Sequence, residues 1–321
     1  MPPAFYGLLL GLLCVTVPAL AETIYVSNER DNTISVIDGS SLKMTATIAI
    51  GRRPRGIALS RDKAKLYVAV GDDDRIDVVD LKARRVESSI PSGPDPEFFA
   101  LHPDGQRLFV ANEDNNLASV VDLSRPAVTR EIEVGVEPEG VGVSPDGRLA
   151  AVTSETTSMI HVIDTQSLEL VDNVLVDTRP RMVLFSPDSK QIWVSSELRG
   201  TVSVFDAQTR EPIGKIGFEV PGVPRELVQA VGIQITPDGT RAYVALGPAN
   251  RVAEIDARTF KVLRTYLVGH RVWHIALSPD GKRLYTANGN SNDVSVIDLE
   301  NRRVIKSIGA GRSPWGVVVA P

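Results

Sequence analysis

The chain has 321 residues, of which 43% are hydrophobic and only 5% aromatic, so its core must consist mainly of Val, Ile, Leu and Ala. Its 40 acidic and 35 basic residues leave a net charge of −5, which argues against nucleic acid as a partner. The single cysteine, Cys14, lies near the start, so the rest of the chain has no thiolate metal site and no cysteine nucleophile.

The first segment in chain order, residues 1–21, resembles a secretory signal peptide. An apolar stretch covers residues 8–17, and Ala19 and Ala21 form a small-x-small cleavage site before Glu22. No Lys or Arg precedes the stretch, which departs from the usual pattern. The stretch is too short for a permanent membrane span. We therefore expect cleavage after Ala21, a soluble periplasmic protein and one domain over residues 22–321.

A run of β-branched residues that ends in aspartate recurs along the mature chain. The aspartates are Asp38, Asp80, Asp122, Asp164, Asp206, Asp256 and Asp298. Their separations are 42, 42, 42, 42, 50 and 42 residues, so one supersecondary unit is repeated. Because these aspartates recur in every unit, we interpret them as turn-forming residues and not as a site.

A second motif keeps the same spacing, as in Ser144-Pro145-Asp146-Gly147 and Ser278-Pro279-Asp280-Gly281. Pro followed by Asp-Gly is typical of tight turns, because Pro fixes φ and Gly accepts positive φ. Apolar runs flank this turn, and the run ending in Asp and a fourth run complete the unit. Each unit therefore predicts four short strands joined by three hairpin connections.

Four strands per unit predict a blade, and the chain as a whole predicts an all-β, seven-bladed β-propeller. Residues 23–26 correspond to the second strand of a unit, whereas residues 316–321 correspond to a first strand. The N- and C-terminal strands should therefore share one blade, which closes the ring and removes its free edges.

Two stretches carry a resemblance to a known family. The repeats beginning Tyr25-Val26-Ser27-Asn28 and Leu284-Tyr285-Thr286-Ala287-Asn288 resemble those of the YVTN β-propeller family. The resemblance extends over residues 23–321 and implies the propeller fold without implying one function.

A narrower resemblance concerns residues 221–233, which belong to the one 50-residue interval. This segment is similar to one in the β-propeller proteins associated with PQQ-dependent catabolism. The similarity implies a periplasmic accessory protein, not itself a dehydrogenase, beside a quinoprotein alcohol dehydrogenase. The similarity also implies PQQ, Ca²⁺ or a lanthanide ion as the ligand. Apart from the similarity, we expect a monomer, and a periplasmic transport component is a second candidate partner.

The loops at one end of the ring differ most between units. The residue just before each predicted first strand is Arg55, Glu97, Glu139, Arg181, Val231, Trp273 and Trp315. Structural positions in a repeat should converge on one residue type, so this variation indicates a ligand site at the channel mouth.

Two chemistries suit such a mouth. Hard cations prefer carboxylate oxygens, and the candidate metal ligands are Glu97, Glu139, Asp95, Glu137, Glu29, Glu113, Glu155 and Glu197. Alternatively, a carboxylated quinone such as PQQ would pair with arginines and contact flat aromatic rings. The candidate residues for that ligand are Arg55, Arg181, Trp273, Trp315, His270 and Glu226.

Other interpretations remain open at this stage. Arg55 with Glu97, and Glu139 with Arg181, could be salt bridges between neighbouring blades. His274 replaces a Gly of its repeat position and is better explained as a packed residue. The insertion within residues 217–230 could be a lid over the mouth or an ornamental loop.

The sequence contains no nucleophile paired with a base, no His cluster and no Gly-rich phosphate loop. We therefore expect a binding protein and not an enzyme. One alternative is a propeller-type hydrolase or lactonase, with Glu97 and Glu139 as acid and base, or with a metal ion that Asn112 or Asn288 helps to hold. Another is a platform on which a protein partner docks.

Overall fold

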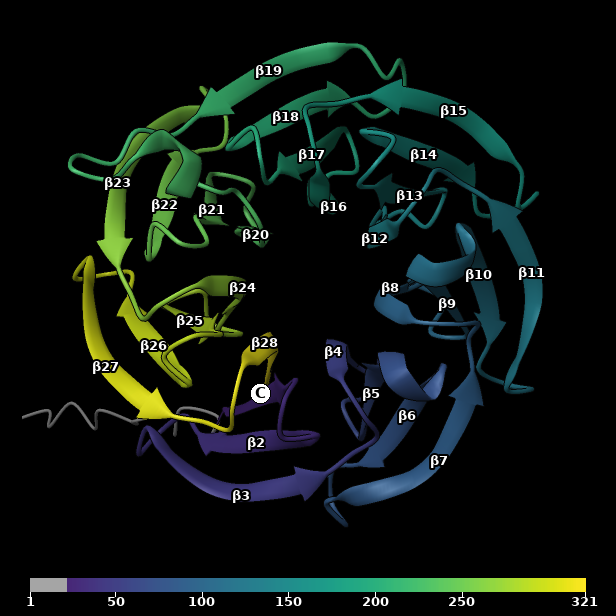
Figure 1. The fold of residues 1–321 in the computed structure, drawn as a ribbon, viewed down its shortest axis with the longest axis horizontal. Helices are drawn as coiled ribbons and strands as arrows, with labels where there is room; N and C mark the ends of the chain where they lie inside the picture. Colours follow the sequence, from purple (N-terminus) through teal and green to yellow (C-terminus); the bar gives the residue numbers. More distant parts are fainter. Residues whose placement is uncertain (1–21) are drawn as a thin grey trace, which may run out of the picture.

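Seven four-stranded antiparallel sheets surround a central axis in the computed structural model, which describes residues 22–321 (Figure 1). The seven-bladed propeller predicted from the repeat period is confirmed. The predicted signal peptide, residues 1–21, lies outside the described residues.

The strands of each blade are given in order from the innermost to the outermost. Blade 1 contains β28 (Pro314–Ala320), β1 (Thr23–Asn28), β2 (Thr33–Asp38) and β3 (Lys43–Ala49); blade 2 contains β4 (Pro54–Leu59), β5 (Lys65–Val70), β6 (Arg75–Asp80) and β7 (Arg85–Pro91). Blade 3 contains β8 (Pro96–Leu101), β9 (Arg107–Asn112), β10 (Leu117–Asp122) and β11 (Ala127–Glu133); blade 4 contains β12 (Pro138–Val143), β13 (Leu149–Ser154), β14 (Met159–Asp164) and β15 (Leu170–Leu175).

The remaining blades follow the same order. Blade 5 contains β16 (Pro180–Phe185), β17 (Gln191–Ser196), β18 (Thr201–Asp206) and β19 (Pro212–Gly217); blade 6 contains β20 (Ile233–Ile235), β21 (Arg241–Ala245), β22 (Arg251–Asp256) and β23 (Lys261–Leu267). Blade 7 contains β24 (Val272–Leu277), β25 (Arg283–Asn288), β26 (Asp293–Asp298) and β27 (Arg303–Gly309). Three single-turn 3₁₀ helices lie in the loops: η1 (Gly71–Asp73), η2 (Glu113–Asn115) and η3 (Arg225–Leu227). Over residues 22–321, no helix is long and apolar enough to cross a membrane.

The ring closes through blade 1. Strand β28 from the end of the chain pairs antiparallel with β1, placing Val317 opposite Val26 and Val319 opposite Ile24. The two strands lie side by side in Figure 1. The predicted sharing of one blade by both ends of the described chain is therefore confirmed.

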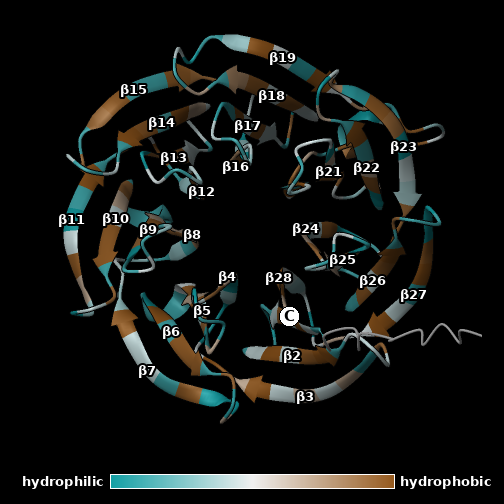
Figure 2. Ribbon diagram, turned by 180° about the vertical axis from the view of Figure 1, so that it is seen from behind, coloured by the Kyte–Doolittle hydropathy of each residue, from teal (hydrophilic) through white to brown (hydrophobic). Residues whose placement is uncertain are grey.

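The core lies in the seams between blades. Middle strands such as β5 bury residues on both faces, because each sheet is covered by a neighbouring blade on either side. One seam joins Ile34 and Val36 of blade 1 to Leu66 and Val68 of blade 2. Figure 2 shows hydrophobic residues along the strands and mainly hydrophilic residues in the loops.

The aspartates that end each third strand hold the following turn. Asp38 accepts hydrogen bonds from the Ser41 amide (2.7 Å) and the Ser40 hydroxyl (2.7 Å). Hydrogen bonds from Ser41 and Ser40 lower the pKa of Asp38 to about 2. Asp206 accepts from the Thr209 amide in the same way (2.8 Å). These contacts support the interpretation of the repeated aspartates as structural residues.

The hub of the propeller is filled by large side chains from only some blades. Phe98 of β8 stacks on His274 of β24, with ring centroids 5.4 Å apart and planes at 16°. His274 also contacts Trp315 of β28, with centroids 4.2 Å apart. His274 is thus packed, as its place in the repeat suggested.

The repeat position of Phe98 and His274 is a glycine in the preceding blades, Gly56 in blade 2 and Gly232 in blade 6. A Cβ atom on Gly56 would lie 2.9 Å from the Glu97 carbonyl oxygen, and one on Gly232 would lie 2.7 Å from the Trp273 carbonyl oxygen. The inner strands therefore approach too closely for any larger residue there. Beneath the channel mouth, Phe98, His274 and Trp315 contact one another, while the glycines allow neighbouring inner strands to approach closely.

Candidate functional site

The channel mouth is built from the second residue of six inner strands, from Val231 just before β20, and from the loops between second and third strands. Five inner strands begin with Pro, which suits a first strand position because it needs no amide donor. Side-chain hydroxyl groups of the preceding blade hold the backbone of the residue that follows this proline. The Ser27 hydroxyl donates to the Arg55 carbonyl (2.7 Å), and the Thr153 hydroxyl donates to the Arg181 carbonyl (3.1 Å).

One group of charged residues spans blades 1 to 3. Arg55 donates to Glu29 (Nε to Oε1, 3.1 Å) and to Glu97. Arg53 lies 3.0 Å from the other oxygen of Glu97 and also pairs with Asp95. The Glu97 side chain is completely buried between these two guanidinium groups. The predicted contact of Arg55 with Glu97 across blades is therefore present.

Glu113, at the start of η2, adds a second carboxyl group to Glu97. Carboxyl oxygens of the two side chains lie within 4.8 Å of each other. Burial raises the pKa of Glu113 to about 7, and the charge of Glu97 adds to the shift. Burial alone would raise the pKa of Glu97, but Arg55, Glu113 and Arg53 lower it overall. Glu97 is therefore the charged member of the pair, and Glu113 exchanges its proton near neutral pH.

A second group of charged residues centres on Arg181 in blade 5. Arg181 lies 2.7 Å from Glu139 of blade 4 and also pairs with Glu155. Arg179 lies 2.6 Å from Glu155 and 3.4 Å from Glu197. Burial raises the pKa of Glu139 well above its usual range, although the Arg181 charge opposes the shift. The second predicted salt bridge between blades is also present.

Trp273 joins this group through Arg271. The Arg271 guanidinium lies 4.1 Å from the centre of the Trp273 ring, a cation–π contact. It donates to Glu197 (2.8 Å) and to Gln229 (2.8 Å). Our sequence reasoning missed Arg271, although its repeat position also contains Arg53 and Arg179. The arginines at this shared repeat position could have identified Arg271 as a candidate site residue from the sequence.

The insertion before blade 6 reaches the mouth through Gln229. Its Val220, Val228 and Ala230 side chains are buried, and the Val228 carbonyl lies against Gly200. The insertion is thus a packed part of blades 5 and 6 that holds Arg271. This arrangement does not fit a freely opening lid.

Three predicted site residues lie outside the two charged groups. Glu137 accepts a hydrogen bond from Thr156 in a loop of its own blade. His270 and Glu226 are exposed, and only their backbones take part in the described hydrogen bonds. The repeat identified their position along the chain but not the direction of their side chains, so their part in the site stays a prediction. The structure does bring together Arg55, Arg181, Trp273, Trp315, Glu29, Asp95, Glu97, Glu113, Glu139, Glu155 and Glu197.

An open cavity of about 580 Å³ lies at this face. Glu29, Arg53 and Trp273 line it together with the rim arginines Arg52 and Arg312. The cavity thus reaches residues of both charged groups.

The predicted metal ligands converge in one place within the described chain. Ligand atoms of Asp95, Glu97 and Glu113 all lie within 4.8 Å of one another. However, Arg53 and Arg55 already engage Asp95 and both oxygens of Glu97. A cation placed there would meet two guanidinium groups, so the arrangement is a poor fit for a resident ion.

The amides suggested as further metal ligands are committed elsewhere. Asn112 donates to Ser119 (2.8 Å), and Asn288 donates to Ser295 (3.0 Å). Both contacts lie within a blade and support its second and third strands.

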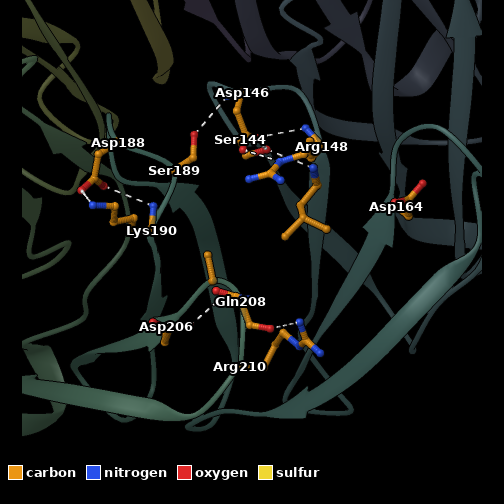
Figure 3. Close-up of a pocket in the computed structure, with 12 residues that line it drawn as sticks. Ser144, Asp146, Arg148, Asp164, Asp188, Ser189, Lys190, Asp206, Gln208 and Arg210 are labelled. Atoms are coloured by element: carbon orange, nitrogen blue, oxygen red, sulfur yellow. Dashed lines mark hydrogen bonds and ion pairs between the residues drawn. The ribbon is translucent and has the colours of Figure 1, made fainter.

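A further cavity of about 570 Å³ lies on the opposite face between blades 4 and 5 (Figure 3). Asp146 and Asp188 line it, but each accepts a hydrogen bond from the serine of its own turn, Ser144 or Ser186 (2.6 Å each). Figure 3 shows Ser189 directed toward Asp146. The Asp146 amide donates a hydrogen bond to the Ser189 hydroxyl oxygen (3.0 Å). These side chains hold turns together and do not form a second acid–base pair.

Two family models match parts of the sequence. Residues 176–304 match the model described as lactonase, 7-bladed β-propeller, and residues 72–183 match the cytochrome D1 heme domain. Each match covers less than half of the chain. No curated protein matches the sequence.

Solved structures show the same fold. A chain of hydrazine synthase from Kuenenia stuttgartiensis is 23% identical with a TM-score of 0.79, covering 86% of this chain and 92% of that chain. A proposed 6-phosphogluconolactonase from Bacteroides fragilis is 16% identical with a TM-score of 0.80, covering 95% and 99%. A second protein so described, from Bacteroides uniformis, is 16% identical with a TM-score of 0.78, covering 94% and 99%. At these identities the likeness establishes the fold alone.

The lactonase match changes one conclusion drawn from the sequence. We expected no enzyme because no nucleophile, His cluster or phosphate loop is present, and the match over residues 176–304 makes that expectation wrong. The physical reason is that a lactone is a reactive ester, which water can open when one carboxylate acts as general base. The finer resemblance to YVTN and PQQ-linked proteins is not confirmed by these matches. A PQQ, metal or protein partner stays a prediction.

Proposed function

We propose that this protein is a lactone hydrolase whose active site is the channel mouth, with Glu113 as the general base. The lactonase family match supports the reaction class. The observation that carries the assignment is the Glu97–Glu113 pair, whose carboxyl oxygens lie within 4.8 Å of each other and in which burial raises the pKa of Glu113 to about 7. A base with a pKa near the working pH is the most effective for proton transfer.

The reaction begins when the Glu113 carboxylate accepts a proton from water as the water oxygen attacks the lactone carbonyl carbon. The carbonyl oxygen gains negative charge, and the Arg55 guanidinium beside Glu97 stabilises it. The tetrahedral intermediate then collapses, the ring C–O bond breaks, and Glu113 returns the proton to the leaving oxygen. The product is an open hydroxy acid, and no protein nucleophile is consumed.

Glu97 acts in this scheme through Glu113. Two arginines keep Glu97 ionised, so its charge helps to hold the Glu113 pKa near neutrality. The sequence alternative paired Glu97 with Glu139. In the structure, the carboxyl group close to Glu97 within its own blade is that of Glu113.

The cellular setting is a further part of the proposal. The features of residues 1–21 support export, so we place the reaction in the periplasm.

The test is hydrolysis of a panel of δ- and γ-lactones, measured as acid release above the uncatalysed rate. For the wild type, kcat/KM should rise with pH and level off above about pH 7, because the base must be deprotonated. Glu113→Gln should lower kcat by about 100-fold or more and remove this pH dependence. Glu137→Gln is the matched control outside the charged groups and should keep activity. A wild-type rate equal to the uncatalysed rate on every lactone would refute the proposal.

A further inference from the structure

One sector of the channel mouth differs from the rest in its exposed arginines. Arg30 lies in the loop between β1 and β2, Arg312 shortly precedes β28, and Arg52 shortly precedes β4, so all three come from the connections around blade 1. All three line the open cavity of about 580 Å³. The lining comes from loops of blades 7, 1 and 2, which are neighbours in the ring (Figure 1).

The repeat does not require arginine at these positions. The position of Arg30 contains, in the other blades, Asp72, Asp114, Thr156, Leu198, Pro248 and Asn290. The shared position of Arg52 and Arg312 contains, in four other connections, Pro94, Val136, Thr178 and His270. A position that only supports a blade should keep one residue type, so the arginines of this sector point to a role outside the blade itself.

Arg30 has a free side chain. It is exposed, and only its backbone takes part in hydrogen bonds with the other described residues. The two carboxylates in the cavity wall are engaged by other arginines, because Glu29 lies 3.0 Å from Arg55 and Asp72 lies 3.1 Å from Arg53. Within the described part of the chain, the cavity wall therefore contains one guanidinium group without a carboxylate partner.

The rim arginines Arg52 and Arg312 are held in place but keep free donors. The Arg52 Nε lies 2.7 Å from Asp73, and its Nη2 donates to the carbonyl of the residue before Asp73 (2.6 Å). Arg312 makes the same two contacts with Asp31 (2.5 Å) and with the carbonyl of the residue before Asp31 (3.2 Å). Among residues 22–321, neither Nη1 group has a partner. Guanidinium groups oriented in this way lose little further freedom when they bind an anion.

The arrangement of these donors favours separate carboxylate groups. A carboxylate is planar and pairs with a guanidinium group through two parallel hydrogen bonds. The free donors belong to three different loops, and the volume of the cavity is typical of sites for whole small molecules. Trp273 also lines the cavity, but Arg271 already lies over its ring at 4.1 Å. An aromatic ligand would have to compete with that guanidinium group for the ring, whereas an aliphatic ligand would not.

We propose that this cavity binds an aliphatic dicarboxylate, with one carboxylate on Arg30 and the other on the free Nη1 group of Arg52 or Arg312. The inference is independent of the proposed reaction, because the ligand contacts neither Glu97 nor Glu113. A local group of exposed arginines also attracts such an anion to a protein whose net charge is −5.

Calorimetric titration with succinate tests the inference. We expect succinate to bind at least about tenfold more tightly than butyrate, which has a carbon chain of the same length but only one carboxylate. Inorganic phosphate should bind more weakly than succinate, because it has a single anionic centre. The affinity for succinate should fall about threefold or more between about 0.05 and about 0.5 M NaCl, since salt screens charges that are exposed to solvent.

Two arginine variants locate the contact. Arg30→Gln keeps a polar side chain, removes the charge and should weaken succinate binding about tenfold. Arg199→Gln is the matched control, because Arg199 is exposed in the equivalent loop of blade 5 and does not line the cavity. Its affinity for succinate should equal that of the wild type. No succinate binding, equal binding of succinate and butyrate, tighter binding of phosphate, or equal losses in the two variants would each overturn the inference.

Discussion

Arg181 and Glu139 form a 2.7 Å ion pair between blades 5 and 4, with only 8% and 5% of their side chains exposed. Burial of two charges costs desolvation free energy, which the pair recovers only while both partners are present. Arg181 also serves Glu155, so one cation holds two buried carboxyl groups. The salt bridge between blades 4 and 5 is therefore part of the second charged group, beside the group that contains Glu97 and Glu113.

Removal of Arg181 should strongly destabilise the propeller. Arg181→Met leaves Glu139 and Glu155 without their main partner and should lower the free energy of unfolding by about 3–5 kcal/mol, measured by urea denaturation. Arg179→Met is a suitable control because 44% of the Arg179 side chain is exposed, and the loss there should stay below about 1 kcal/mol.

Adding Glu139→Gln to Arg181→Met should restore part of the lost stability, since one unpaired carboxyl group is then removed. Equal losses for Arg181→Met and Arg179→Met would contradict this account of the network.

Glu113 should make the protein less stable as the pH rises. Its pKa is about 7 in the folded protein against an ordinary 4.5, so the folded state holds a proton that the unfolded state releases between these values. Stability is greatest below about pH 4.5 with respect to this group and falls as the pH rises through about 7. Glu113→Gln mimics the protonated side chain.

We therefore expect Glu113→Gln to raise the free energy of unfolding at about pH 8 by roughly 1–2 kcal/mol more than at about pH 5, with solvent screening taken into account. Urea denaturation at the two pH values measures the difference. The same substitution should abolish hydrolysis, so stability and activity change in opposite directions. A stability difference independent of pH would show that Glu113 titrates normally.

Metal binding should be controlled by Arg53. The predicted Ca²⁺ or lanthanide site would use Asp95, Glu97 and Glu113, and Arg53 pairs with the first two. Arg53→Met removes this competing cation, and terbium should then bind about tenfold or more tightly than to the wild type in calorimetry. Arg52→Met, which frees Asp73 at the rim, should bind terbium no better than the wild type. Equal terbium affinity in the wild type and Arg53→Met would contradict this role of Arg53.

The sequence predicts the fold because the propeller is periodic. The aspartates from Asp38 to Asp298 recur at a fixed spacing, and each one proves to bond its own turn. The varied position that contains Arg55, Glu97, Glu139, Arg181, Trp273 and Trp315 was also visible, since repeats make a departure from the common residue obvious. Repeat spacing thus located the site and predicted its two salt bridges.

Other properties of the site depend on three-dimensional contacts that spacing does not encode. Glu113 became the candidate base only when its burial and its closeness to Glu97 were known. His270 and Arg271 are neighbours in sequence, yet His270 is exposed while Arg271 contacts Trp273 and Glu197. A repeat identifies equivalent backbone positions, but it does not tell which adjacent side chain turns toward the axis.

Because glycines and bulky residues occupy the hub position in different blades, each blade fits only its own place in the ring. Gly56 lies beside Phe98, Gly140 beside Met182 and Gly232 beside His274, whereas Gly316 of blade 1 is followed by Gly56 of blade 2, so the alternation is broken once around the ring. Exchanging blade 2 with blade 3 would bring together partners that either collide or leave a void. The blades repeat one pattern, but the close contacts at the hub make them structurally non-equivalent, so a blade cannot be exchanged without repacking its neighbours.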